Sequence, residues 1–253
     1  RQRQMCIRDS NWTVWCTQNV LLTTFLMPWS VEMSSRLSSP VRTFCGNAPL
    51  FLPENTSDTV VTLQAILHKA AESCDYFLKD YGNDGCCEEG AQYYRHAGLC
   101  LYGAMTVLNT VTDGHFDTLF RWDKVKNIAS YILNVHVNDK YYFNFADCSP
   151  IAGRAGVREY LFGKATGQED LCLFAAKDFQ AGQGQLVTDE VNGGNLFYRM
   201  QTVFHYEELM QQNTSGILSH RDVYYPSVGL FLVHSDTLDL AVKAGYNADS
   251  HNH

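Results

Sequence analysis

Apolar residues recur at helical spacing over most of the chain. From Asp58 onward they fall three or four residues apart, while Lys69 and Glu72 lie on the opposite side of the same helix. Ser57 or Asp58 is suited to cap its first turn, because a side-chain oxygen there can accept hydrogen bonds from backbone N–H groups. The predicted buried stripe consists of Leu63, Ile66, Leu67, Ala70, Cys74, Phe77 and Leu78.

The same periodicity predicts helices on both sides of this one. Residues 11–29 are expected to form a buried or cleft-lining helix that Pro28 helps to end, and residues 31–57 are expected to form a long irregular loop. A glycine-containing break at 82–90 follows the first stripe. The helices predicted after it are 91–111, with Leu101, Ala104, Met105 and Leu108 on one face, another around 125–133, and three more within 154–179 and 196–210.

The periodicity changes from helical to extended near Tyr224. The apolar run 228–233 and the alternating segment that starts at Leu238 are expected to pair as a β-hairpin across residues 234–237. Successive helices with turn-rich connections indicate a helical toroid or bundle. The predicted fold class is therefore a multidomain α + β protein, mainly α, with a helical domain at 11–222 and the start of an antiparallel β domain at 223–253.

Composition and charge narrow the possible functions. The chain has 253 residues, 45% of them hydrophobic, which suits a globular protein with a sizeable core. Its net charge of -8 argues against a nonspecific nucleic-acid binder, which needs clustered Lys and Arg. Nine irregularly spaced cysteines form no disulfide framework for a domain of this size, which favours a reducing compartment. No segment has the uninterrupted apolar length of a transmembrane helix.

The first ten residues do not resemble a natural leader. They have no apolar periodicity and are similar to a peptide encoded by sequencing-adapter DNA in metagenomic assemblies, so 1–10 is predicted to be non-native. The natural protein is expected to extend beyond both ends of this chain. With its native N-terminus missing, a cytoplasmic location is predicted, and a periplasmic or secreted one is the alternative.

Two histidines stand at the C-terminal end. His251 and His253 are two residues apart, so in an extended segment they project from one face, with Asp249 further back on the same face. This arrangement suits a metal ion or a proton-transfer pair. An exposed histidine-rich tail is the alternative, although the strand pattern that precedes it favours a site.

A second group of chemically active residues spans 83–98, around the sequence DGCCEEGAQYYRHAG. Glu88 and Glu89 also suit a first helical turn, where acidic side chains oppose the helix dipole. Tyr94 lies three residues before Ala97 and is also compatible with a buried core position. The candidates in this segment are Asp84, Glu88, Glu89, Tyr93, Tyr94, Arg95 and His96.

The order of motifs resembles the heparinase II/III-like polysaccharide lyases. These motifs are NWTVWCTQN at 11–19, DGCCEEGAQYYRHAG at 84–98, YPSVGLFLV at 225–233 and AGYNADSHNH at 244–253. The resemblance implies an (α/α) toroid followed by the first strands of an antiparallel β sandwich. It also implies a cleft for uronic-acid polymers, such as heparin-like, alginate-like or pectin-like chains, and a structural zinc ion in the β domain.

The resemblance assigns roles in β-elimination to particular residues. That reaction needs a neutralised carboxylate, a base for the C5 proton and an acid for the departing O4. Tyr94 is the implied acid/base, with Tyr93 as the fallback, and His251 is its partner. Asn11 would neutralise the carboxylate, although Trp12 stands where many relatives have histidine. The implied substrate-binding residues are Trp12, Gln18, Glu89, Arg95 and His96, and His253 is the first ligand of a zinc site that this chain leaves incomplete.

Two other functions remain open from the sequence. A glycoside hydrolase on the same helical toroid would use Asp84 with Glu88 or Glu89 as paired carboxylates. A noncatalytic relative would bind sugar or metal without turnover. Asp147 could lie at the cleft, but a short turn leading into Pro150 is the preferred explanation. In the lyase and hydrolase readings the expected partner is an acidic polysaccharide or oligosaccharide, with neither nucleic acid nor membrane, and the oligomeric state is left open.

Overall fold

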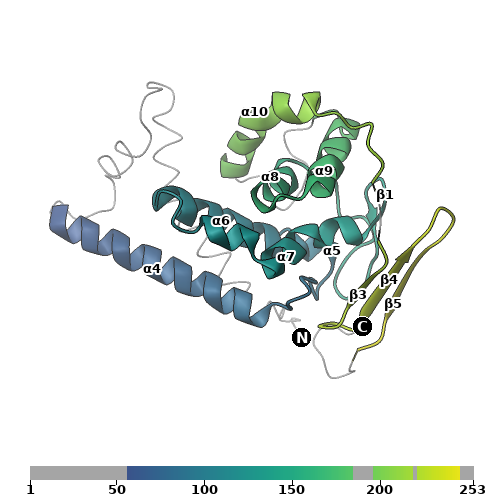
Figure 1. The fold of residues 1–253 in the computed structure, drawn as a ribbon, viewed down its shortest axis with the longest axis horizontal. Coiled ribbons are helices and arrows are strands. Elements are labelled where there is room, and N and C mark those ends of the chain that lie inside the picture. Colours follow the sequence, from purple (N-terminus) through teal and green to yellow (C-terminus); the bar gives the residue numbers. More distant parts are fainter. Residues whose placement is uncertain (1–55, 185–195, 219–220, 246–253) are drawn as a thin grey trace, which may run out of the picture. The chain divides into compact units, whose positions relative to one another are not determined.

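The computed structural model describes residues 56–184, 196–218 and 221–245 of the chain. These residues form a mixed α/β structure, rich in helix, with two small antiparallel sheets (Figure 1). They divide into a first unit, 56–80 with 100–117, and a second unit, 81–99 with 118–245. Within the described ranges, no helix is long and apolar enough to cross a membrane.

The first unit contains helix α4 (Thr56–Asp80) and most of α6 (Gly98–Val111). The stripe predicted for α4 is confirmed at its C-terminal half, where Ala70, Cys74, Phe77 and Leu78 are buried, whereas Ile66 and Leu67 are only half-buried. The face predicted for α6 is buried too, at Leu101, Ala104, Met105 and Leu108. The apolar stripes identified from spacing alone are therefore the buried faces of these helices.

The single helix predicted at 91–111 is two helices in the structure. The short α5 (Ala91–Tyr94) ends in a turn at 95–97, and α6 begins at Gly98. The ring of Tyr94 packs against Gly98 so closely that a Cβ atom at Gly98 would lie 2.5 Å from Tyr94 Cε2. The break between α5 and α6 occurs at this contact, which the spacing of apolar residues does not predict.

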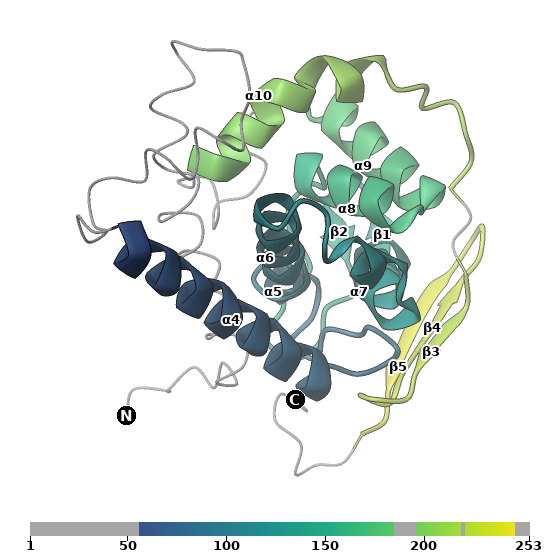
Figure 2. The same ribbon diagram turned by 60° about the vertical axis from the view of Figure 1, so that its left-hand side comes forward.

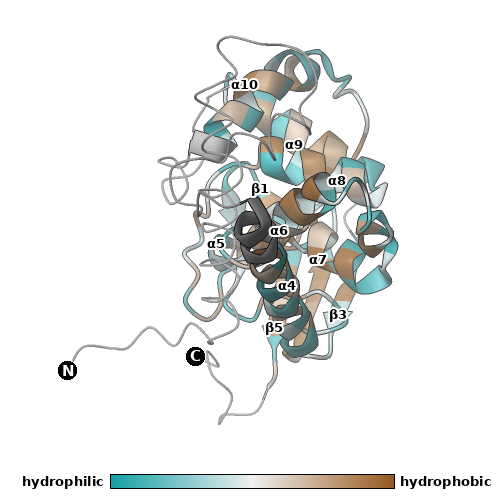
Figure 3. Ribbon diagram, turned by 90° about the vertical axis from the view of Figure 1, so that its left-hand side faces the viewer, coloured by the Kyte–Doolittle hydropathy of each residue, from teal (hydrophilic) through white to brown (hydrophobic). Residues whose placement is uncertain are grey.

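The second unit contains the remaining helices. Figure 2 shows α8, α9 and α10 lying together, with α7 next to α8. The sequence predicted one helix around 125–133 and three between 154 and 210, and these are confirmed. Both apolar and polar residues appear around α9 and α10 in the hydropathy colouring of Figure 3, as expected of helices buried on one side. Their bounds are α7 Asp123–Asn134, α8 Val157–Thr166, α9 Glu169–Ala181 and α10 Leu196–Gln211, with a 3-10 turn η2 at Asp117–Arg121.

The two antiparallel sheets also belong to the second unit. The predicted hairpin is confirmed: β4 (Leu230–His234) pairs with β5 (Asp239–Lys243), with Leu232 opposite Ala241. Strand β3 (Val223–Tyr225) pairs with the other side of β4, so the order is β3-β4-β5 (Figure 1). A smaller hairpin, β1 (His136–Asn138) with β2 (Tyr141–Tyr142), follows α7 and was not predicted.

Candidate functional site

Tyr94, the first choice for the acid/base, points into the core. Its side chain is 0% exposed, and its hydroxyl donates a hydrogen bond to the carbonyl of Ala129 at 3.1 Å. Its ring lies 5.7 Å from the ring of Tyr131, and burial raises the pKa of Tyr94 well above the ordinary tyrosine value. This placement disagrees with the role assigned to Tyr94, because an acid/base must reach the sugar.

Tyr93, the fallback, lies on the outer side of the same helical turn. It is half-buried, and its hydroxyl makes no hydrogen bond to another described residue. Its ring centroid is 6.1 Å from that of His96, since residues three apart share a helix face. Burial raises the pKa of Tyr93, and the nearby charges of Asp147 and Glu89 raise it further. The Tyr93 hydroxyl therefore keeps its proton near neutral pH, and its raised pKa makes it a weaker acid than an ordinary tyrosine.

A loop at 143–150 packs against α5 and brings Asp147 to this site. Gly90 allows the close approach, because its φ is +91° and a Cβ there would lie 2.4 Å from Cys148 Cβ. Two hydrogen bonds join the loop to Gln92. The Gln92 backbone N–H donates to Cys148 Sγ at 3.3 Å, and its side-chain Oε1 accepts from Ser149 N at 3.3 Å. Asp147, which the sequence treated as a turn residue, thus becomes an exposed acidic neighbour of Tyr93.

Arg95 and Glu89, both predicted to bind substrate, are almost fully buried. Arg95 is 3% exposed, and its Nε lies 3.5 Å from Oε1 of Glu159, which is buried as well. The guanidinium also lies over the ring of Tyr142, at 5.8 Å from its centroid. An arginine enclosed in this way balances a buried carboxylate and is not presented to solvent. The position of Arg95 therefore disagrees with the predicted role in substrate binding.

Asp84 ties the glycine-containing loop to the β3–β4 turn. Its Oδ2 accepts from Ser227 N at 2.8 Å, and its Oδ1 accepts from Ser227 Oγ at 2.8 Å and from Cys86 N at 3.2 Å. A carboxylate with both oxygens engaged in this way is positioned as a structural tether. This arrangement opposes the hydrolase alternative, which needs Asp84 as a catalytic carboxylate.

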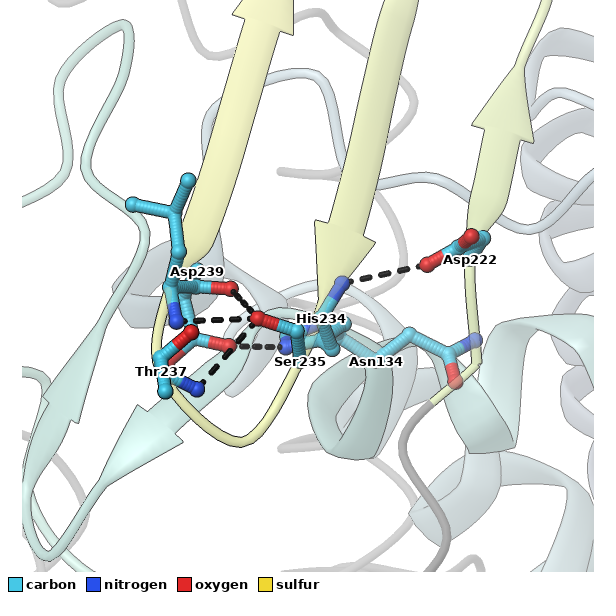
Figure 4. A network of polar contacts seen from close by, with 7 residues as sticks. Asn134, Asp222, His234, Ser235, Thr237 and Asp239 are labelled. Atoms are coloured by element: carbon cyan, nitrogen blue, oxygen red, sulfur yellow. Dashed lines mark hydrogen bonds and ion pairs between the residues drawn. The ribbon is translucent and has the colours of Figure 1, made fainter.

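A histidine network that residue spacing does not predict lies where strand β4 ends (Figure 4). The His234 side chain is 3% exposed, with Nδ1 2.8 Å from Asp239 Oδ1 and Nε2 2.9 Å from the carbonyl oxygen of Asn134. The His234 backbone N–H also donates to Asp222 at 3.1 Å. An Asp–His pair can act as a general base, but here both ring nitrogens contact oxygens of the protein. The network holds the sheet against the end of α7.

Several predicted site residues lie outside the described part of the chain. They are Asn11, Trp12, Gln18, His251 and His253. Among the described residues, no group of three or more His, Cys, Asp or Glu side chains converges as a metal site. Zinc stays a prediction that rests on His253, which lies outside the described residues.

Comparison with models of known protein families gives no match, and a search of curated proteins finds no significant similarity. The resemblance to heparinase II/III-like lyases therefore rests on the motifs of the sequence. The geometry brings His96, Asp147 and Glu89 close to Tyr93, and it separates Tyr94, Arg95 and Asp84 from that site.

Proposed function

We propose that this protein cleaves 4-linked uronic-acid-containing glycans by β-elimination, as a carbon–oxygen lyase. The observation that carries the proposal is the position of Tyr93, a half-buried tyrosine beside His96 in the segment whose motif resembles the lyases. A hydroxyl that keeps its proton and lies at the surface can protonate the departing O4 of a bound sugar. Tyr93 thus takes the role that the resemblance first assigned to Tyr94.

The proposed elimination consists of one proton removal, one bond cleavage and one proton donation. A base removes the C5 proton, the C4–C5 double bond forms, the C4–O4 bond breaks, and O4 takes the proton of Tyr93. The substrate carboxylate needs a cation, because Asp147 and Glu89 make the surroundings of Tyr93 acidic. We assign this role to His96, whose ring centroid lies 6.1 Å from that of Tyr93, whereas Arg95 already pairs with Glu159. His251 is the proposed partner for proton transfer.

The finer fold is part of the same proposal. The helices α4 to α10 would belong to an (α/α) toroid, and β3 to β5 would be the first strands of an antiparallel β sandwich. The succession of helices followed by an antiparallel sheet supports this order. Zinc would be held in the β domain with His253 as a ligand, and no step of the proposed reaction depends on it.

The test uses the adjacent tyrosines as a matched pair. We would follow the growth of near-ultraviolet absorbance from unsaturated uronate on heparin-like, alginate-like and pectin-like polymers. Tyr93→Phe is expected to lower the rate by about 10²- to 10⁴-fold, the usual contribution of an acid/base. Tyr94→Phe makes the same chemical change in the core and is expected to leave most of the rate intact.

The other outcomes identify the other functions. Loss of the rate in Tyr94→Phe but not in Tyr93→Phe would return the acid/base role to Tyr94. New reducing ends without the absorbance change would indicate a hydrolase. Binding of a polymer without either product would indicate a sugar-binding protein. The hydrolase result and the binding result would each refute the lyase.

A further inference from the structure

Strand β5 is exposed on both faces and at its outer edge. It forms one edge of the β3-β4-β5 sheet, and within the described residues no strand pairs with its outer side. On one face, Leu240 and Val242 are 44% and 46% exposed, and on the other face Ala241 is exposed as well. An edge strand with exposed apolar side chains is a template for pairing with another strand.

The backbone groups that face outward from β5 can be assigned from its pairing with β4. Ala244 N donates to Gly229 O at 2.8 Å, and Leu238 O accepts from Ser235 N at 3.0 Å, so both residues direct their backbone toward β4. Direction alternates along an antiparallel strand. Leu240 and Val242 therefore also face β4, while Asp239, Ala241 and Lys243 direct their N–H and C=O groups to the outer edge.

The sequence of β5 is complementary to itself in an antiparallel pair of two copies. The strand runs Asp239, Leu240, Ala241, Val242, Lys243, with an acid at one end and a base at the other. In an antiparallel pair centred on Ala241, Asp239 of each copy lies opposite Lys243 of the other, and Leu240 lies opposite Val242. Opposite charges and apolar pairs at directly facing positions both stabilise a sheet.

We propose that β5 pairs with β5 of a second copy of this chain, in the antiparallel register centred on Ala241. In this register all three outward-facing residues form hydrogen-bonded pairs, so the outward backbone groups of each β5 are satisfied by the other copy. A shift by two residues in either direction leaves both charges without opposite partners. The two three-stranded sheets become one continuous sheet with two-fold symmetry, which closes the assembly at two copies.

The charge pairing is compatible with the histidine network at the end of β4. Asp239 keeps its Oδ1 on His234, at 2.8 Å, and Lys243 lies over the ring of Phe145, at 5.4 Å from its centroid. Both contacts are made on the inner face, where Asp239 and Lys243 of the two copies also face each other. The proposal relies on the sign and position of these charges and is independent of the lyase function.

Sedimentation equilibrium of the full chain over a concentration series tests the proposal. A dimer is expected, and Lys243→Glu should weaken it by about tenfold or more, because it replaces two attractive charge pairs with repulsive ones. Ala241→Pro should abolish it, since proline removes the central outward N–H without taking a donor from the pairing with β4. Lys243→Arg and Ala241→Ser, which keep the charge and the N–H, are the matched controls and should stay dimeric.

Circular dichroism would verify that each variant folds, and amide exchange would identify what covers the edge. A dimer in which the Asp239 and Ala241 amides are protected from exchange supports the proposal. In Ala241→Pro, the Asp239 amide should lose that protection. A monomer at all concentrations overturns it, including a monomer whose β5 amides are protected by another part of its own chain. A dimer that neither Lys243→Glu nor Ala241→Pro weakens overturns the proposal as well. So does an aggregate without defined stoichiometry.

Discussion

Replacing Asp84 with alanine tests whether this residue is a tether or a catalytic acid. The substitution removes three hydrogen bonds to a carboxylate, two from Ser227 and one from Cys86. A hydrogen bond to a charged group contributes about 1.5–3 kcal/mol when buried. Because the Ser227 contacts are exposed and the three are not additive, we expect a total loss of about 2–3 kcal/mol in the free energy of unfolding.

Urea unfolding followed by circular dichroism measures this loss, and Ser227→Ala separates its parts. That variant removes only the hydroxyl donor and should cost about 1 kcal/mol. In the double variant, removal of the Ser227 hydroxyl costs little more because the Asp84 carboxylate that it contacts is already gone, so the combined loss should be smaller than the sum of the single losses. An Asp84→Ala protein as stable as the original, but without activity on glycans, would refute the structural role and favour the hydrolase.

Three further predictions follow from individual contacts. Gly98→Ala should destabilise the fold by about 1–3 kcal/mol in thermal denaturation, because the new Cβ would meet the Tyr94 ring at 2.5 Å; an unchanged midpoint would contradict that packing. Tyr94→Phe should cost about 1 kcal/mol, measured in urea, through the lost bond to Ala129. Hydrogen bonds from Lys164, His205 and Tyr160 lower the pKa of Glu208 to about 2, so the stability that this carboxylate contributes above the ordinary value of 4.5 is lost as pH falls toward 2. Glu208→Gln should reduce that acid-dependent loss in urea titrations at successive pH values, and an unaltered pH profile would contradict it.

The helices could be predicted because their burial follows their own periodicity. The stripe of α4 and the helix α7 depend on spacing within a single segment, and both appear at the expected positions. The break between α5 and α6 depends on the approach of Tyr94 to Gly98, and the β1–β2 hairpin has strands too short to show alternation. What the sequence missed are features decided by contacts between segments or by very few residues.

The same distinction governs the site. The density of polar and aromatic residues at 84–96 indicates a candidate region, because density is a property of one segment. The partners that define each role come from elsewhere: Glu159 for Arg95, Ser227 for Asp84 and the carbonyl of Asn134 for His234. No spacing rule connects residues so far apart, so candidates that looked alike in the sequence separate into tethers, core residues and surface residues only in three dimensions.

Tyr93 and Tyr94 show how one motif serves two purposes. Adjacent residues of a helix project about 100° apart, so a turn that buries one tyrosine directs its neighbour outward. Tyr94 fixes α5 through Ala129 and Gly98, and this anchoring in turn holds Tyr93 beside His96 and Asp147. A substitution at Tyr94 can therefore lower activity by releasing α5, and the hydroxyl-only change to phenylalanine is the one that separates anchoring from chemistry.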